Sequence, residues 1–221
     1  MPPAGEFLAK EGGERRSDAA LTQQTGDGIQ TVLILACGAL AREILALIEV
    51  NGWRHMELTC LPAKLHLYPD KIADEVEKAV ARHRDHYARI FVAYADCGTG
   101  GLLQARCEAL GVEMIAGPHC YSFFEGNDVF AAKSEEEMTK FFLTDFLVKQ
   151  FDAFVWKPMG LDRHPELLPM YFGHYEKLVY QAQTHDEDLT HKARAAAERL
   201  GLAFERRFTG YGDLETALAR A

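Results

Sequence analysis

Three of the five cysteines in this chain each follow a short apolar run that is typical of a β-strand. The pairs of run and cysteine are 31–36 with Cys37, 90–96 with Cys97, and 112–119 with Cys120. Because the carboxyl ends of parallel strands meet at one edge of an open α/β sheet, we expect the three thiols to lie together there. Three sulfur ligands with an open fourth position suit a zinc ion or a [4Fe-4S] cluster. A metal-free thiolate enzyme is the alternative.

The run from Asp96 to Gly101, with the sequence DCGTGG, is the most specific single motif. Its glycines allow a ligand to approach the backbone, and the helix expected next would present free N–H groups. We therefore expect an anion such as a phosphate or carboxylate to bind at Gly98, Thr99, Gly100 and Gly101. The same helix start would lower the pKa of Cys97 and make it a nucleophile. The alternative is a purely structural role, as a tight turn with a buried cysteine. The spacing of the glycines matches neither a Walker loop nor a Rossmann fingerprint.

Three further side chains are candidates for catalysis. His119 directly precedes Cys120 and would complete a ligand set of three cysteines and one histidine, or orient a ligand by hydrogen bonding. Arg163 and His164 stand at an expected helix start, where they could bind an anionic substrate. An exposed first turn capped by Asp162 is the alternative for these two.

The composition limits the function classes. The formal net charge of −9 excludes a general nucleic-acid binder, which needs a basic surface for phosphates. No apolar stretch reaches the roughly 18 residues that span a bilayer, and the first 30 residues carry no signal-peptide core. We therefore expect a cytoplasmic protein, and cysteines in that reducing compartment are more often metal ligands or catalytic groups than disulfides.

Apolar runs alternate with capped helical patterns along the chain after residue 29. Strands are expected at 31–36, 56–61, 90–95, 112–116, 177–183 and 202–208. Helices are expected at 39–50, 70–84, 102–110, 134–150, 163–172, 188–200 and from 214, with 152–155 as a further helical segment. This alternation predicts a three-layer, Rossmann-like α/β fold with a mainly parallel open sheet of five or six strands. We expect residues 1–29 to form a flexible arm and residues 30–221 a single domain.

Several strings together resemble one family, the domain-of-unknown-function family 1638. They are ILACGALAREI, YADCGTGGLL, GPHCYSFFEG, FFLTDFL, GLDRHPEL and TGYGDLE, and they extend from about residue 31 to the C-terminus. The resemblance implies a setting in one-carbon metabolism, near corrinoid-dependent methyltransferase systems for methylated amines. It implies no reaction. The resulting hypothesis is a metal- or iron–sulfur-binding enzyme that acts on a small anionic metabolite, with a non-catalytic partner of a corrinoid methyltransferase as the alternative.

Overall fold

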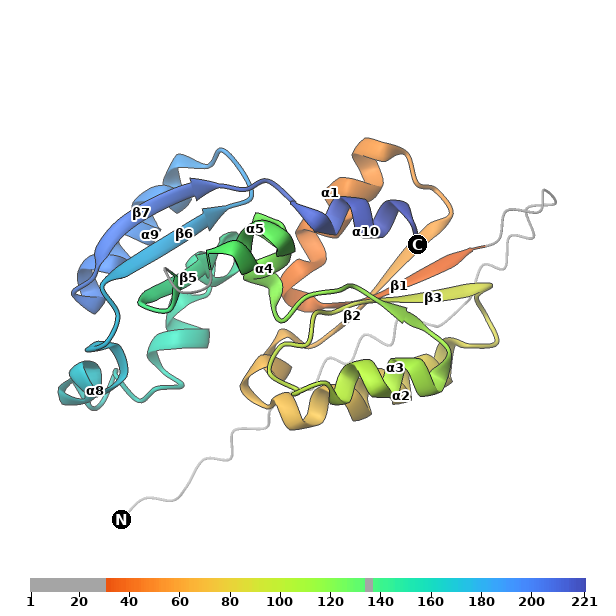
Figure 1. Ribbon diagram of the computed structural model, residues 1–221, viewed down its shortest axis with the longest axis horizontal. Helices are drawn as coiled ribbons and strands as arrows, with labels where there is room; N and C mark the ends of the chain where they lie inside the picture. The colour runs from red at the N-terminus through yellow and green to blue at the C-terminus, as the bar shows by residue number, and fades with distance from the viewer. Residues whose placement is uncertain (1–30, 134–136) are drawn as a thin grey trace, which may run out of the picture.

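The computed structural model describes residues 31–133 and 137–221, which form an α/β structure with two parallel sheets (Figure 1). The first sheet has the strand order β2-β1-β3-β4. Its strands are β1 (Val32–Cys37), β2 (Met56–Leu61), β3 (Arg89–Ala93) and β4 (Glu113–Met114). All six residues of β1 are buried between its two neighbours, so this continuous apolar run forms the centre of the sheet.

Helices cover both faces of the first sheet. In Figure 1, α2 (Ile72–His83) and α3 (Leu102–Leu110) lie below the sheet, and α1 (Ala41–Asn51) lies above it. The C-terminal helix α10 (Asp213–Ala219) joins α1 on the upper face, where its Leu214 and Leu218 are fully buried in the core of this sheet. The last helix of the chain is therefore part of the core that begins with its first strand.

The second sheet has the order β5-β6-β7 and its own buried core. Its strands are β5 (Lys140–Thr144), β6 (Lys177–Ala182) and β7 (Ala203–Phe208). The helices around it are α7 (Asp145–Lys149), a π-helical segment (Asp152–Trp156), α8 (Leu168–Phe172) and α9 (Glu187–Leu200). Asp186 caps α9 by accepting a hydrogen bond from Leu189 N–H, and left-handed Gly201 ends the helix.

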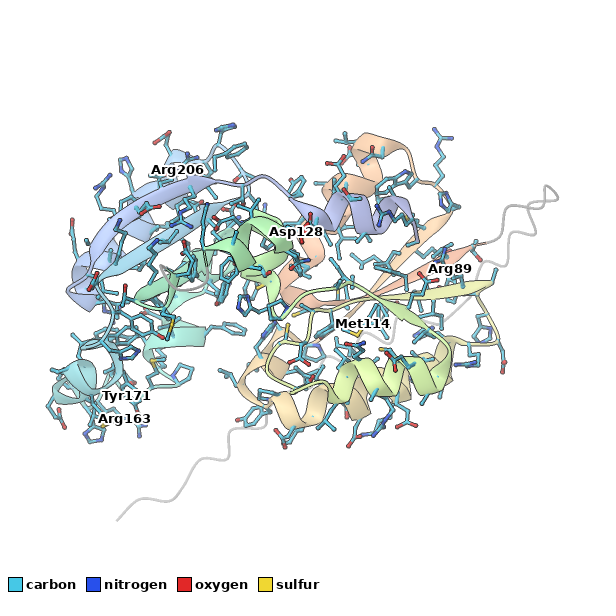
Figure 2. All side chains as sticks on the ribbon, in the orientation of Figure 1. Arg89, Met114, Asp128, Arg163, Tyr171 and Arg206 are labelled. Atoms are coloured by element: carbon cyan, nitrogen blue, oxygen red, sulfur yellow. The ribbon has the colours of Figure 1, made fainter. Side chains whose placement is uncertain are left out.

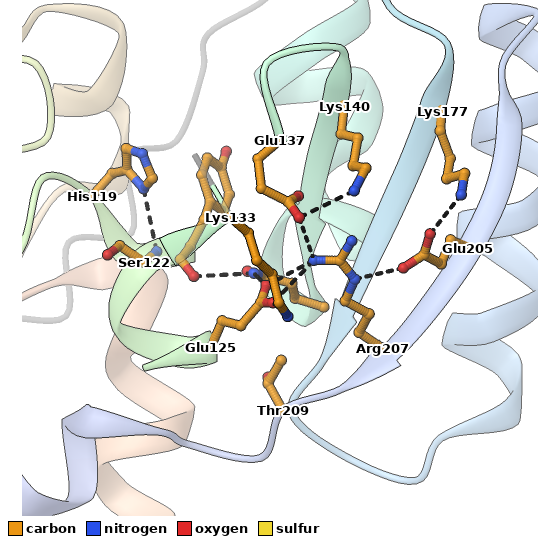
Figure 3. A network of polar contacts seen from close by, with 12 residues as sticks. His119, Ser122, Glu125, Lys133, Glu137, Lys140, Lys177, Glu205, Arg207 and Thr209 are labelled. Atoms are coloured by element: carbon orange, nitrogen blue, oxygen red, sulfur yellow. Dashed lines mark hydrogen bonds and ion pairs between the residues drawn. The ribbon is translucent and has the colours of Figure 1, made fainter. Parts of the chain in front are cut away.

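Two short helices, α4 (Cys120–Glu125) and α5 (Asn127–Ala132), connect the sheets. Phe123 and Phe124 of α4 are buried in the first core, while Glu125 at the end of the same helix pairs with Arg207 of β7. Figure 3 shows Arg207 at the centre of this network, where it also bonds Glu137 and Glu205. Apolar packing thus fixes one side of α4 and ion pairs fix the other.

The α/β class and the parallel pairing of β1 with β3 are confirmed. The expectation of one sheet with five or six strands is wrong, because the described residues form seven strands in two sheets. The helix expected over 134–150 is also wrong, since residues 140–144 form β5 in parallel register with β6. The apolar residues of this run fit the helical period as well as the strand period, and pairing with β6 stabilises the strand.

Residues 1–30 and 134–136 lie outside the described part, and with them the predicted arm and the start of the helix expected over 134–150. Among the helices of the described part, none combines the length and the apolar character that crossing a membrane requires.

Candidate functional site

Cys37 is the last residue of β1 and lies at the carboxyl edge of the first sheet. It is 2% exposed, and its Sγ accepts a hydrogen bond from Ala39 N–H at 3.4 Å. His66, from the loop after β2, brings its Nε2 to 3.1 Å from the same sulfur. The first predicted thiol therefore has a histidine partner that the sequence analysis missed. The only signal for it was a histidine in a proline-flanked loop after a strand.

Cys97 and Cys120 come from neighbouring loops that are bonded to each other. Cys97 N–H donates to the Pro118 carbonyl at 2.9 Å, and Asp96 N–H donates to the Gly117 carbonyl at 3.0 Å. Cys97 has a φ of +51°, the only positive value for a non-glycine residue in the described part of the chain. Such a conformation costs about 1–3 kcal/mol, so the surrounding hydrogen bonds must impose it. The result is that the loop after β3 lies directly against the loop that leads into Cys120.

The pKa values of all three thiols are raised, and part of the rise at Cys97 and Cys120 comes from the charges of other thiols of this set. Burial, as the main cause, raises the pKa of Cys37 to about 11 and that of Cys97 to about 12, and it raises the pKa of Cys120 well above its usual value. The charge of Cys37 adds to the rise at Cys97, and the charges of Cys97 and Cys37 add to the rise at Cys120. The prediction that the helix start lowers the pKa of Cys97 is therefore wrong, because desolvation outweighs it.

The other two cysteines differ in position. Cys107 is buried within α3, and Cys60 is exposed on β2, opposite Ala36 of β1. The hydroxyl of Tyr94 is buried beside Cys37 and Cys97 and has no hydrogen bond of ordinary length within the described residues. Burial raises its pKa, and the charges of the nearby thiols raise it further.

The predicted anion site at 98–101 is filled by the protein itself. The Asp96 carboxylate accepts hydrogen bonds from Thr99 Oγ1 (2.6 Å), Gly101 N–H (2.7 Å) and Gly100 N–H (3.0 Å). Burial opposes the ionisation of Asp96, but these bonds outweigh it and lower its pKa. The expectation of an external anion at these N–H groups is corrected accordingly, since a carboxylate three to five residues away reaches them first.

A pocket of about 380 Å³ opens beside Cys97 and Cys120, and it lies between the carboxyl ends of the two sheets. We call it the thiol pocket. Loops of the first sheet supply its polar wall, which includes His66 and His119. The opposite wall comes from β5, α7 and the π-helical segment and is rich in apolar side chains, among them Phe141, Phe146, Leu147, Phe154 and Val155. No lysine or arginine lines this pocket within the described residues, so its wall does not supply the charge that a small anion would need.

His119 lies at the thiol pocket, as predicted, whereas Arg163 and His164 do not line it. The Nδ1 of His119 accepts a hydrogen bond from Ser122 N–H at 3.3 Å, and burial lowers its pKa, so the ring is neutral at pH 7. Arg163 is 74% exposed, and Figure 2 shows it at the lower left end of the molecule, far from Arg89 of the first sheet. His164 pairs with exposed Glu166 at 3.1 Å. The latter two predicted residues belong to a solvated turn.

No group of three histidine, cysteine or acidic side chains in residues 31–133 and 137–221 is arranged around one ion position. That the three thiols are metal ligands therefore stays a prediction. The structure places Cys37 at the end of β1, and Cys97 and Cys120 in the wall of the thiol pocket at the same edge of the first sheet.

One family comparison and two searches bear on identity. The family described as a protein of unknown function, DUF1638, matches residues 60–218, which is more than half of the chain. Cys97 and Cys120 lie inside the matched segment, and Cys37 precedes it. Searches of curated proteins and of solved structures found no match. Because this match covers more than half of the chain, the chain belongs to the DUF1638 family.

Proposed function

We propose that Cys37, Cys97 and Cys120 hold a metal centre and that a small molecule is bound and processed against it in the thiol pocket. The observation that supports the proposal is that Cys97 and Cys120 line a pocket at the edge of the first sheet where Cys37 ends β1. Ligands of open α/β sheets bind at this edge.

The chemistry of the donor set fits a metal better than a metal-free nucleophile. Three thiols with raised pKa values are protonated at neutral pH, and a protonated thiol is a poor nucleophile. A cation removes this obstacle, because metal binding stabilises thiolates and releases their protons. The Nε2 of His66 lies 3.1 Å from the Cys37 sulfur, and burial lowers the pKa of its ring and keeps it neutral, so it can hydrogen-bond the sulfur and orient it. The Tyr94 hydroxyl, which is buried beside Cys37, supplies a further polar group at the same place.

Within this proposal we favour an iron–sulfur cluster over a single zinc ion. Zinc needs its ligands around one point, and the described residues offer no such group of three. In a [4Fe-4S] cluster each thiolate binds a different iron, so the sulfurs stand further apart. When bound, such a cluster with three protein ligands supplies a Lewis-acidic iron to the pocket.

The residues of the thiol pocket define what binds there. Its aromatic wall excludes water and lowers the local dielectric constant, which strengthens polar contacts with the ligand. His66 and His119, both neutral, are the groups that would bond the polar end of a substrate. A neutral compound with an apolar part suits this wall better than a small anion. The setting in corrinoid-dependent methyl transfer rests on the family resemblance alone, and it adds a corrinoid protein or methyltransferase as a candidate partner.

Metal content after anaerobic purification tests the proposal. We expect iron and sulfide in stoichiometric amounts and a brown colour; a colourless protein with one zinc ion per chain would support the zinc alternative. Cys37→Ser, Cys97→Ser and Cys120→Ser should each lose most of the metal. Cys107→Ser is the matched control, because its thiol is as buried as that of Cys37 but lies apart from the site. The proposal would be contradicted if the wild-type protein contained no metal as purified and also bound none after reconstitution with iron and sulfide or with zinc.

A further inference from the structure

A second pocket of about 380 Å³ lies at the carboxyl edge of the second sheet. We call it the Glu43 pocket. One wall is α1 of the first sheet, which contributes Arg42 and Glu43. The other wall comes from the segments that follow β5, β6 and β7, with Asp145, Lys149 and Tyr211 among its residues. The pocket shares no lining residue with the thiol pocket, so the second sheet has a pocket of its own at the edge where open α/β sheets bind ligands.

Glu43 is the unusual group in this wall. Its side chain belongs to a residue that is only 7% exposed, and its Oε2 has no hydrogen-bond partner among the residues that the structure describes. Leaving a buried polar atom unpaired costs about 1–3 kcal/mol, and more for a charged group. Burial raises the pKa of this carboxyl group, with the charge of Asp145 contributing in the same direction. A ligand that donates a hydrogen bond to Oε2 would remove this cost.

Asp145, the other buried acid of the pocket, shows the contrast. It is 2% exposed, but its carboxylate accepts hydrogen bonds from Tyr180 OH (2.7 Å), Gln183 N–H (3.1 Å) and Thr184 Oγ1 (2.6 Å). Asp186 at the pocket is likewise used, since it caps α9. Asp145 and Asp186 therefore have hydrogen-bond partners within the protein, whereas the Oε2 of Glu43 has none among the described residues.

The cations of the pocket complete the pattern. Arg42 and Lys149 both line it, both are exposed, and neither forms an ion pair within residues 31–133 and 137–221. A buried acceptor inside and two cations at the mouth match a ligand with a positive group at one end and a negative group at the other. A metal ion matches less well, because no three donors of the described chain surround one position.

We propose that the Glu43 pocket binds a small zwitterion of the α-amino-acid class, with the ligand amino group on Glu43 and its carboxylate on Arg42 and Lys149. This site is separate from the thiol pocket and does not depend on the metal centre. Helix α7 contributes to the walls of both pockets, so an occupant here contacts a helix that also lines the thiol pocket.

Thermal-shift and calorimetric titrations with the twenty free amino acids, their N-acetyl derivatives and their methyl esters test the proposal. We expect at least one free amino acid to raise the melting temperature, its N-acetyl derivative to lose binding through loss of the amino charge, and its ester to bind about tenfold more weakly. Glu43→Gln should weaken binding by about tenfold or more, and so should Lys149→Met, an exposed change that leaves folding intact. Glu49→Gln, on the exposed face of the same helix, is the matched control, and Cys97→Ser should bind like wild type.

Three results would overturn the proposal. The first is the absence of any shift with all free amino acids. The second is equal binding by wild type and by Glu43→Gln, with the folded state of the variant verified by circular dichroism. The third is equal binding of free acid and ester together with no effect of Lys149→Met. Failure of metal binding in the cysteine variants would leave all three results unaffected, so the two proposals fail separately.

Discussion

Replacing Arg207 by methionine should destabilise the protein strongly, because Arg207 connects α4 to the second sheet. Its side chain is 18% exposed and bonds three carboxylates: Glu205 at 2.5 Å, Glu125 at 3.0 Å and Glu137 at 3.1 Å. The side chains of Glu125 and Glu137 are 7% and 3% exposed. Methionine keeps most of the volume and removes the charge, so the variant leaves buried carboxylates short of a partner.

The size of the loss in unfolding free energy depends on the partners that the three carboxylates keep in the variant. Each carboxylate keeps one lysine: Lys133 for Glu125, Lys140 for Glu137 and Lys177 for Glu205. Removing one partner of a buried pair costs about 3–5 kcal/mol, and the remaining lysines place the expected loss at about 3 kcal/mol. For a domain of this size, that loss lowers the melting temperature by about 6–12 °C.

The loss should depend on pH. Although burial opposes it, hydrogen bonds from Lys177 and Arg207 lower the pKa of Glu205 from 4.5 to about 2. A lowered pKa gives stability that is present above pH 4.5 and is lost as the pH falls toward 2. The difference between wild type and Arg207→Met should therefore be largest near neutral pH and should narrow below pH 4.5.

Calorimetry or circular dichroism over a pH series measures both effects. Arg163→Met is the matched control, since Arg163 is 74% exposed and 3.9 Å from Asp162, and it should change the unfolding free energy by less than about 0.5 kcal/mol. If Arg207→Met melts within about 2 °C of wild type at pH 7, or if its deficit is the same at pH 3, the network does not stabilise the fold in the way described.

Two further results are expected. In metal-free native protein at pH 7.5, exposed Cys60 should react with iodoacetamide faster than Cys97, because burial raises the pKa of Cys97 to about 12. Peptide mass spectrometry measures both rates. A faster reaction at Cys97 would show that its thiol is activated. In urea unfolding, Gly212→Ala should destabilise the protein more than Gly201→Ala. Both glycines have a positive φ, but only at Gly212 would an added Cβ meet backbone oxygens, those of Phe123 and Phe124. Equal losses of unfolding free energy would mean that the backbone around Gly212 relaxes to remove this contact.

The local sequence determined the elements whose signals are complete within a few residues. Helix α3 was predicted at 102–110 and found there, because Gly111 takes up the left-handed conformation that ends it. The β1 and β3 runs were predicted as strands of one mainly parallel sheet, since continuous apolar runs between helical patterns are typical of buried parallel strands, and the two strands are paired in parallel. Their carboxyl ends then dictated where Cys37 and Cys97 would lie.

Tertiary structure decided whatever depends on partners far along the chain. The run at 140–144 became β5 because β6 offers it a parallel partner, and local periodicity does not reveal that partner. The division into two sheets arose in the same way.

The candidate site also depended on contacts between distant parts of the chain. The DCGTGG glycines predicted an anion site, but the fold let Asp96 reach their N–H groups first. The pKa of Cys97 rose because burial, a property of the folded molecule, outweighed the helix start next to it in sequence. His66 and Glu43 gave no strong signal, because their importance comes from a thiol at 3.1 Å and from a missing hydrogen bond, and both exist only after distant segments have packed together.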